Sequence, residues 1–253
     1  MLNETFYIDG VDARNFGIYL QKPIEFSEAV PVVEIQSVPG RNGDLVFESG
    51  NYENRTAIAP CFCLQKDVEK AISAAGRFLM SKHGYRRVET SDDPDHFWLA
   101  RVENSPQIMQ RMRTLAPFEI GFDCKPQRFL KSGEEKIFLE HSTGTIVRKV
   151  YNQFGFPARP LIHAHWNTES GNFIALQFVN DAGENTTISA RDVDSTDLFI
   201  DCDIHDAYNE LGNQNKHITT YEFPTLQSGE NSIGIYGFDS LEYIEITPRW
   251  WEL

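Results

Sequence analysis

The sequence contains no long apolar run. No stretch of its 253 residues approaches the roughly 18 consecutive apolar residues that a membrane-spanning helix needs. The first residues, Met1 to Thr5, contain neither a basic segment nor an apolar one, so we expect no secretory signal peptide. We therefore expect a protein that has no membrane among its partners.

Cysteine is scarce as well. The chain has four cysteines, Cys61, Cys63, Cys124 and Cys202, which are too few for a disulfide scaffold in a chain of this length. Cys61 and Cys63 would share one strand face and are poorly placed to bridge each other. We expect all four thiols to be reduced and mostly buried, as in a protein that folds in a cytoplasm.

Positive charge is in deficit. Lys and Arg total 23 against 37 for Asp and Glu, so the formal net charge is −14. This balance argues against sequence-independent binding to nucleic-acid phosphates and against attraction to anionic membrane surfaces. The charge is also uneven, because residues 1–130 hold 15 basic and 18 acidic side chains whereas residues 131–253 hold 8 and 19. This asymmetry indicates two units with different surfaces.

The common catalytic and nucleotide-binding motifs are missing. The sequence has no G-x-S-x-G elbow, no phosphate loop ending in GK[ST] and no dinucleotide glycine fingerprint. Carboxylates are numerous, but abundance does not place an acid and a base at a defined separation. We therefore expect no enzyme, no catalytic residues and no cofactor.

Two patterns could bind metal ions. The acidic run from Asp192 to Glu210 could supply oxygen ligands for Ca²⁺, but it lacks the EF-hand spacing and is interrupted by apolar residues. His163 and His165 would share one strand face, and two such histidines with a carboxylate can bind Zn²⁺. Solvated polar residues on exposed strands explain both patterns, so we expect no metal site.

The commonest pattern in the sequence is a period-two alternation of side chains, which is typical of β-strands. Residues 118–124 alternate apolar and polar side chains, which is typical of a half-buried antiparallel strand. Residues 57–64 are apolar at nearly every position, which predicts a strand covered on both faces. In the second half, short alternating runs near residues 173–179, 198–200, 233–236 and 243–246 are separated by turn signals. Such spacing is typical of a β-sandwich or jelly roll.

One segment has helical spacing. Apolar residues recur every three or four positions between Asp67 and Ser81, which predicts a helix there. Asp67 can cap its start, and Gly84 can follow its last turn. This helix is the only one that we expect.

The division of the chain follows a polar run near residues 131–135. We expect domains at residues 1–135 and 136–253. Inside the first, residues 21–54 form a long, poorly periodic stretch rich in proline and glycine. A segment of this length in a compact domain is usually functional or stabilised by a partner chain, although an irregular edge strand with a hairpin would also explain it.

Several segments together resemble one family, the distal tail (Dit) proteins of siphophages that infect Gram-positive bacteria. They occur in the family's order over nearly the whole chain, at residues 38–45 (VPGRNGDL), 91–100 (SDDPDHFWLA), 118–126 (FEIGFDCKP), 152–160 (NQFGFPARP), 223–226 (FPTL), 229–233 (GENSI) and 246–251 (ITPRWW). Each segment is weakly specific, whereas their order and spacing make the resemblance specific.

The resemblance implies a mainly β protein. It would have an N-terminal, ring-forming, β-sandwich-like domain with one α-helix and a C-terminal galectin-like β-sandwich of jelly-roll type. It would be a structural virion protein at the tail tip, assembled in the host cytoplasm as a homohexamer, alone or as two stacked rings. This hub would connect the major tail-tube protein to the tail-tip or baseplate proteins and leave a channel through which DNA passes without specific binding.

The resemblance also gives the long N-terminal stretch a role. The turn of Gly40, Arg41, Gly43 and Asp44 would reach toward a neighbouring subunit, with the glycines allowing a tight turn and Arg41 pairing across the junction. The alternative function is that of a carbohydrate-binding, lectin-like protein that contacts the host cell wall. The sugar-contacting residues of galectins are not recognisable around residues 163–167.

Overall fold

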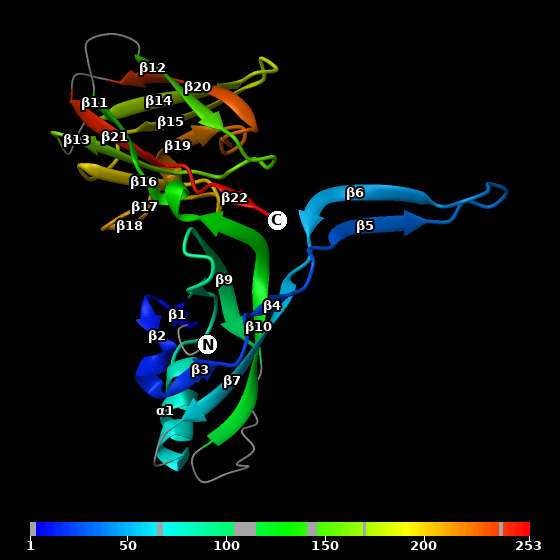
Figure 1. Ribbon diagram of the computed structural model, residues 1–253. Coiled ribbons are helices and arrows are strands. Elements are labelled where there is room, and N and C mark those ends of the chain that lie inside the picture. The colour runs from blue at the N-terminus through cyan, green and yellow to red at the C-terminus, as the bar shows by residue number, and fades with distance from the viewer. Residues whose placement is uncertain (1–3, 65–67, 104–114, 141–145, 169–170, 238–239) are drawn as a thin grey trace. The chain divides into compact units, whose positions relative to one another are not determined.

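The structure is a computed structural model that describes all residues except 1–3, 65–67, 104–114, 141–145, 169–170 and 238–239 (Figure 1). The described residues are mainly β with one α-helix, as predicted. They contain no helix long and apolar enough to cross a membrane. Two compact units have separate cores, Met1–Arg128 together with Leu253, and Phe129–Glu252. The domain boundary expected after residue 135 lies slightly further along the chain than this division after Arg128, and it stays a prediction.

The first unit is built on one large antiparallel sheet. Its strands follow the order β2-β1-β8-β9-β10-β7-β3, and the short β4 also pairs with β7. A 3₁₀ turn, η1 (Ala13–Phe16), joins β2 to β3. The strands are β1 (Phe6–Ile8), β2 (Val11–Asp12), β3 (Ile18–Leu20), β4 (Glu25–Phe26), β7 (Arg55–Leu64), β8 (Arg86–Thr90), β9 (His96–Val102) and β10 (Leu115–Leu130).

The predicted helix is α1 (Val68–Met80). Its residues Ala75, Phe78 and Leu79 are buried in the core of the first unit, as the three- and four-residue spacing predicts. At its C-terminal end the carbonyl of Phe78 accepts a hydrogen bond from Arg86 Nη1 at 3.0 Å, which satisfies one of the free carbonyls of the last turn. The predicted cap Asp67 lies outside the described residues.

Strand β7 differs from the prediction on one face. Ala57, Ala59, Cys61 and Cys63 are buried, but Ile58 on the opposite face is 46% exposed. The prediction that both faces of this strand are covered is therefore wrong at Ile58. Small side chains line the buried face, where the helix and sheet approach closely, and a large apolar side chain faces outward within this chain.

The second unit is a sandwich of two antiparallel sheets. One sheet has the strand order β11-β21-β13-β16-β17-β18, and the other has the order β12-β20-β14-β15-β19. The first sheet consists of β11 (Ile137–Glu140), β13 (Leu161–Trp166), β16 (Asp197–Asp201), β17 (Asp206–Asn209), β18 (Gly212–Asn213) and β21 (Leu241–Thr247). The second consists of β12 (Ile146–Asn152), β14 (Phe173–Asn180), β15 (Asn185–Arg191), β19 (Ile218–Thr220) and β20 (Gly229–Gly237).

The core of the second unit lies between these sheets. On β13, Ile162, Ala164 and Trp166 are fully buried, whereas the alternate residues His163 and His165 lie on the outer face. Two 3₁₀ turns, η2 (Lys131–Glu134) and η3 (Asn215–His217), and a last strand, β22 (Trp251–Glu252), complete the unit. The sandwich predicted for the second half is confirmed.

Candidate assembly interface

The segment from 25 to 56 contains no buried residue, although buried residues Ile24 and Ala57 flank it. Within it, β5 (Pro31–Gln36) and β6 (Leu45–Tyr52) form a two-stranded sheet of their own. Figure 1 draws this hairpin as a ribbon that continues from β4 and β7. We call residues 30–53 the arm.

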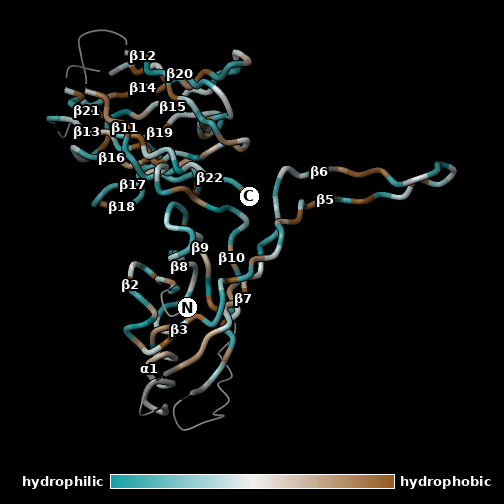
Figure 2. Tube along the Cα trace, in the orientation of Figure 1, coloured by the Kyte–Doolittle hydropathy of each residue, from teal (hydrophilic) through white to brown (hydrophobic). Residues whose placement is uncertain are grey.

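Both faces of the arm carry exposed apolar side chains. Directly opposed residues lie on the same face, so the pair Ile35 and Val46 belongs to one face and the pair Glu34 and Phe47 to the other. Ile35, Val46 and Phe47 are 63%, 58% and 51% exposed. Figure 2 shows hydrophobic stretches in both strands of the arm. Exposed apolar patches of this kind mark contacts with another molecule.

The arm also has unpaired backbone groups on both edges. Neither β5 nor β6 pairs with any other strand among the described residues. An isolated two-stranded hairpin is marginally stable in water, and exposed strand edges readily pair with another chain. Covering the apolar faces or the edges would therefore stabilise the arm.

The base of the arm is attached firmly to the first unit. The ring of Phe26 stacks on Trp98 with the ring centroids 4.3 Å apart. The Ser27 amide donates to the carbonyl of Thr56 at 2.8 Å, and Arg55 Nε donates to the carbonyl of Ser27 at 2.7 Å. These contacts fix the point at which the hairpin leaves its unit.

The four residues predicted at the interface all lie in the turn between β5 and β6. Gly40 and Gly43 have φ values of +83° and +79°, which non-glycine residues rarely adopt, so glycine suits both positions of the turn. The Arg41 amide donates to the carbonyl of Val38 at 3.1 Å. Among the residues that the structure describes, the side chains of Arg41 and Asp44 form no ion pair. Their contact with a neighbouring subunit stays a prediction.

The exposed strand residues of the arm were not among the predicted interface residues. Glycine and charged residues make the turn conspicuous in the sequence, whereas Ile35, Val46 and Phe47 have the pattern of ordinary strand residues. The available signal was that apolar residues occupy both alternation phases of these strands. A two-stranded ribbon has no core of its own to cover either face.

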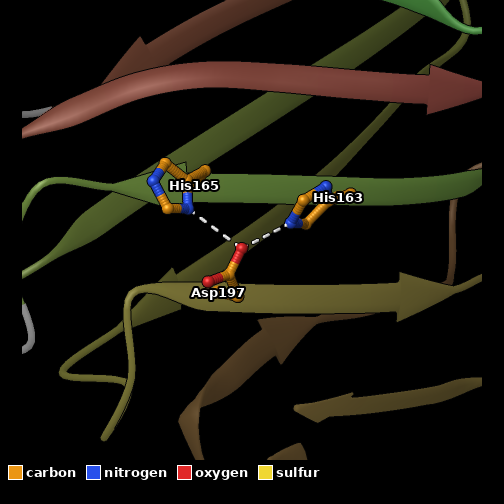
Figure 3. Close-up of side chains that lie close together, drawn as sticks. All are labelled: His163, His165 and Asp197. Carbon is orange, nitrogen blue, oxygen red and sulfur yellow. Dashed lines mark hydrogen bonds and ion pairs between the residues drawn. The ribbon is translucent and has the colours of Figure 1, made fainter. Parts of the chain in front are cut away.

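A second cluster lies on the outer face of the sandwich. His163 and His165 on β13 both face Asp197 on β16 (Figure 3). His163 Nε2 and His165 Nδ1 lie 2.7 Å and 2.9 Å from Asp197 Oδ1. Burial alone would raise the pKa of Asp197, but the hydrogen bonds from the two imidazoles outweigh it and hold that pKa below its ordinary value.

The acidic run from Asp192 to Glu210 does not converge on one point. Asp201 pairs with Arg249, and Asp194 pairs with Lys216. Asp206 accepts hydrogen bonds from the side-chain amides of two neighbouring asparagines. The acidic residues of this run thus make separate local contacts. Of those named here, Asp197 is the one that contacts the two histidines.

Comparisons with known proteins agree on the fold. No family model matches the sequence, and no curated protein matches it. Among solved structures, the chain is similar to the crystal structure of SPP1 Dit (gp 19.1), described as a paradigm of the hub adsorption apparatus in phages infecting Gram-positive bacteria, with a TM-score of 0.70, 14% identity and 99% of both chains covered.

The chain is also similar to proteins of the phage p2 baseplate. Structures of that baseplate in its activated conformation with Sr and with Ca both match with a TM-score of 0.56. The identities are 11% and 10%, and each match covers 96% of this chain and 97% of the other. The resemblance drawn from sequence segments is therefore confirmed in the fold, because this chain has the fold of a phage distal tail protein along almost its entire length.

Proposed function

We propose that this chain is a structural virion protein, a distal tail hub that assembles with copies of itself into a ring. The observation that carries this proposal is the arm, whose apolar faces and free edges are uncovered in the single chain. The fold shared with a phage hub protein and with baseplate proteins supports the same role.

A second copy of this chain is the partner that fits the arm best. If the arm of one copy lies on a different surface of the next copy, the contact is head-to-tail, and such contacts form a ring when the rotation between copies closes. Ile58, the exposed apolar residue of β7, pairs with Glu25 at the base of the arm and extends the uncovered apolar surface onto the sheet. The family resemblance gives six as the number of subunits, in one ring or two stacked rings.

The hub would lie at the tail tip, between the major tail-tube protein and the tail-tip proteins. DNA would pass through its channel, and a chain with a net charge of −14 offers few cationic contacts that could retain the polymer. Assembly in the host cytoplasm suits four free, buried cysteines. In this role the chain acts through its geometry, without catalysis and without a cofactor.

The test is the mass of the purified chain in solution, together with negative-stain images. We expect ring-shaped particles of six or twelve copies for the wild-type chain. The double variant Ile35→Glu/Val46→Glu places charges on one face of the arm and should yield folded monomers, because both side chains are exposed and lie outside the core. Its circular dichroism should match that of the wild type, and its melting temperature should no longer depend on protein concentration.

The matched control is the double variant Ile204→Glu/Leu211→Glu, which adds the same charge at two residues of the second unit that are 62% and 66% exposed. This variant should assemble like the wild type. A wild-type chain that stays monomeric at high concentration, even with its tail-tube partner added, would count against the hub. Rings that form equally well with Ile35→Glu/Val46→Glu would exclude the arm as the contact.

Carbohydrate binding is the second candidate, and one observation favours it. A row of rings crosses the outer face of the β13 sheet, in which Phe138 packs against Tyr243 and Phe199 packs against Tyr208, with centroids 5.1 Å and 5.6 Å apart. Aromatic faces of this kind can stack on sugars. Saturable binding of host wall polysaccharide that is lost in Phe138→Ala would support this function, whereas the ring assembly would be unaffected.

A further inference from the structure

We infer that His163, His165 and Asp197 form a binding site for a zinc ion or a similar divalent transition metal. The sequence alone predicted no metal site, but the geometry of these side chains points to one. The site belongs to the second unit alone, so it does not depend on the proposed hub function.

Strand pairing brings the three groups together. His165 on β13 is the direct cross-strand partner of Asp197 on β16, and His163 lies two residues away on the same face. One possible ligand atom from each residue lies within 4.8 Å of the others. In a tetrahedral zinc site, ligand atoms about 2.0–2.2 Å from the metal lie roughly 3.3 Å apart. To hold a zinc ion, Asp197 Oδ1 would have to move away from the two nitrogens by about half an ångström or more, and the two nitrogens would have to lie at a similar spacing from each other.

The hydrogen bonding of His163 is unbalanced without a cation. Its Nε2 lies 2.7 Å from Asp197 Oδ1 and its Nδ1 lies 3.2 Å from Glu245 Oε2. A neutral imidazole has only one N–H, so one of these two carboxylates would face a lone pair. Either a second proton or a metal ion on Nε2 removes that repulsion. With the metal in place, Nδ1–H donates to Glu245.

His163 has the hydrogen-bonded outer partner that a metal-ligating histidine usually has, and His165 has a carboxylate nearby. A ligating histidine normally donates its other ring N–H to a carboxylate, which fixes the tautomer and orients the ring. Glu245 serves His163 in this way and is itself held by Lys136 Nζ at 2.6 Å. For His165, Glu242 Oε2 lies 3.7 Å from Nε2, on the side of the ring away from Asp197.

Neighbouring side chains hold the ligands in position. His163 stacks on Phe199 with centroids 4.3 Å apart and an interplanar angle of 9°, and His165 stacks on Tyr243 at 4.9 Å. Thr196 Oγ1 donates to Asp197 Oδ2 at 2.9 Å, which leaves Oδ1 for the two imidazoles. The ligands are therefore oriented before an ion arrives.

The ligand set favours zinc over calcium. Two imidazole nitrogens and one carboxylate oxygen suit Zn²⁺, whereas Ca²⁺ and Mg²⁺ prefer oxygen ligands throughout. The Asp197 side chain is partly exposed, so water can complete the coordination. The site would clip β13 to β16 on the outer face of the sandwich.

The test uses the untagged full-length chain after treatment with a chelator. Titration with ZnCl₂ in competition with a chromophoric chelator should give one ion per chain, and excess CaCl₂ or MgCl₂ should not displace it. The variants His163→Gln, His165→Gln and Asp197→Asn should each weaken binding at least about tenfold. Glu245→Gln should weaken it about tenfold, as expected for an outer partner.

The matched control is His96→Gln. His96 Nδ1 lies 2.6 Å from Asp93 Oδ1, but among the described residues this pair belongs to no group of three possible ligands, so its loss should leave zinc affinity unchanged. NMR of the wild-type chain adds a readout that needs no variant, because the imidazole C–H signals of His163 and His165 should shift on zinc addition. Absence of saturable zinc binding would overturn the inference. Binding that shifts other histidines, or that survives in Asp197→Asn, would overturn it too.

Discussion

Arg249 donates two parallel hydrogen bonds to Asp201, from Nη1 to Oδ1 at 2.7 Å and from Nη2 to Oδ2 at 2.9 Å. The Arg249 amide also donates to the carbonyl of Gly133 at 2.8 Å. The last segment of the chain is thereby attached both to the end of β16 and to η2. Arg249 is part of the ITPRWW segment on which the family resemblance relies. The two parallel hydrogen bonds to Asp201 give a structural reason for an arginine at this position.

Replacing Arg249 by Ala should destabilise the second unit. The Asp201 side chain is largely buried, so the change leaves a carboxylate without its partner, at a cost of roughly 3 kcal/mol. Arg249→Lys should recover only part of this loss, because an ammonium group cannot form both bonds. Denaturant unfolding measures the difference. Arg148→Ala, at an exposed arginine of β12, should change stability by less than about 0.5 kcal/mol.

Stability should fall in acid. Burial alone would raise the pKa of Asp201, but the hydrogen bonds and charge of Arg249 outweigh it, so the pKa is lower than in the unfolded chain. Asp197, paired with the two histidines, is lowered as well. Carboxyls with lowered pKa values stabilise the fold above the unfolded-state pKa of about 4, and this contribution is lost as the pH falls through their folded values.

The measurement is the free energy of unfolding between about pH 3 and pH 7. It should be nearly constant in the upper part of this range and decline steeply below about pH 4. Asp201→Asn should be less stable at neutral pH and should show a shallower decline, because one titrating carboxyl is gone. An equally steep decline in this variant would show that Asp201 does not contribute to the acid response.

Local patterns predicted much of the fold because each depends on neighbours in sequence. The alternation of Phe118, Ile120 and Phe122 with polar residues predicted a strand over residues 118–124, which lies inside β10, and all three are buried as expected. The helix followed from spacing alone. Ile58 was misjudged because alternation shows that a side chain is apolar but does not show whether its own chain covers it.

The candidate sites depend on contacts between distant residues. His165 and Asp197 lie 32 residues apart and meet only because β13 pairs with β16 in one register. A shift of one residue would turn Asp197 to the core face, and no local signal fixes that register. The exposed apolar faces of the arm could not be predicted either, because Ile35 and Val46 resemble core residues in the sequence.

Two glycines should respond to alanine in opposite directions. A Cβ at Gly133 would lie 2.3 Å from the backbone nitrogen of Trp250, so Gly133→Ala must displace the backbone and should cost roughly 1–3 kcal/mol. Gly76 lies inside α1 with open space around its Cβ position, so Gly76→Ala should add about 0.5–1 kcal/mol. Thermal unfolding compares them. If Gly133→Ala left the stability unchanged, the backbone near Trp250 would have to shift at little cost in free energy.

The four cysteines should resist thiol reagents in the folded chain. All four are free and buried. Burial raises the pKa of the Cys63 thiol to about 11. Burial is also the largest cause that raises the pKa values of Cys124 and Cys202 to about 12, with smaller contributions from neighbouring charges. Because the thiolate is the reacting form, alkylation near pH 8 should be at least about a hundredfold slower than in denaturant. Mass spectrometry over time counts the modified thiols, and all four should react once the chain is unfolded. A cysteine that reacts in the folded chain as fast as in denaturant would contradict its burial.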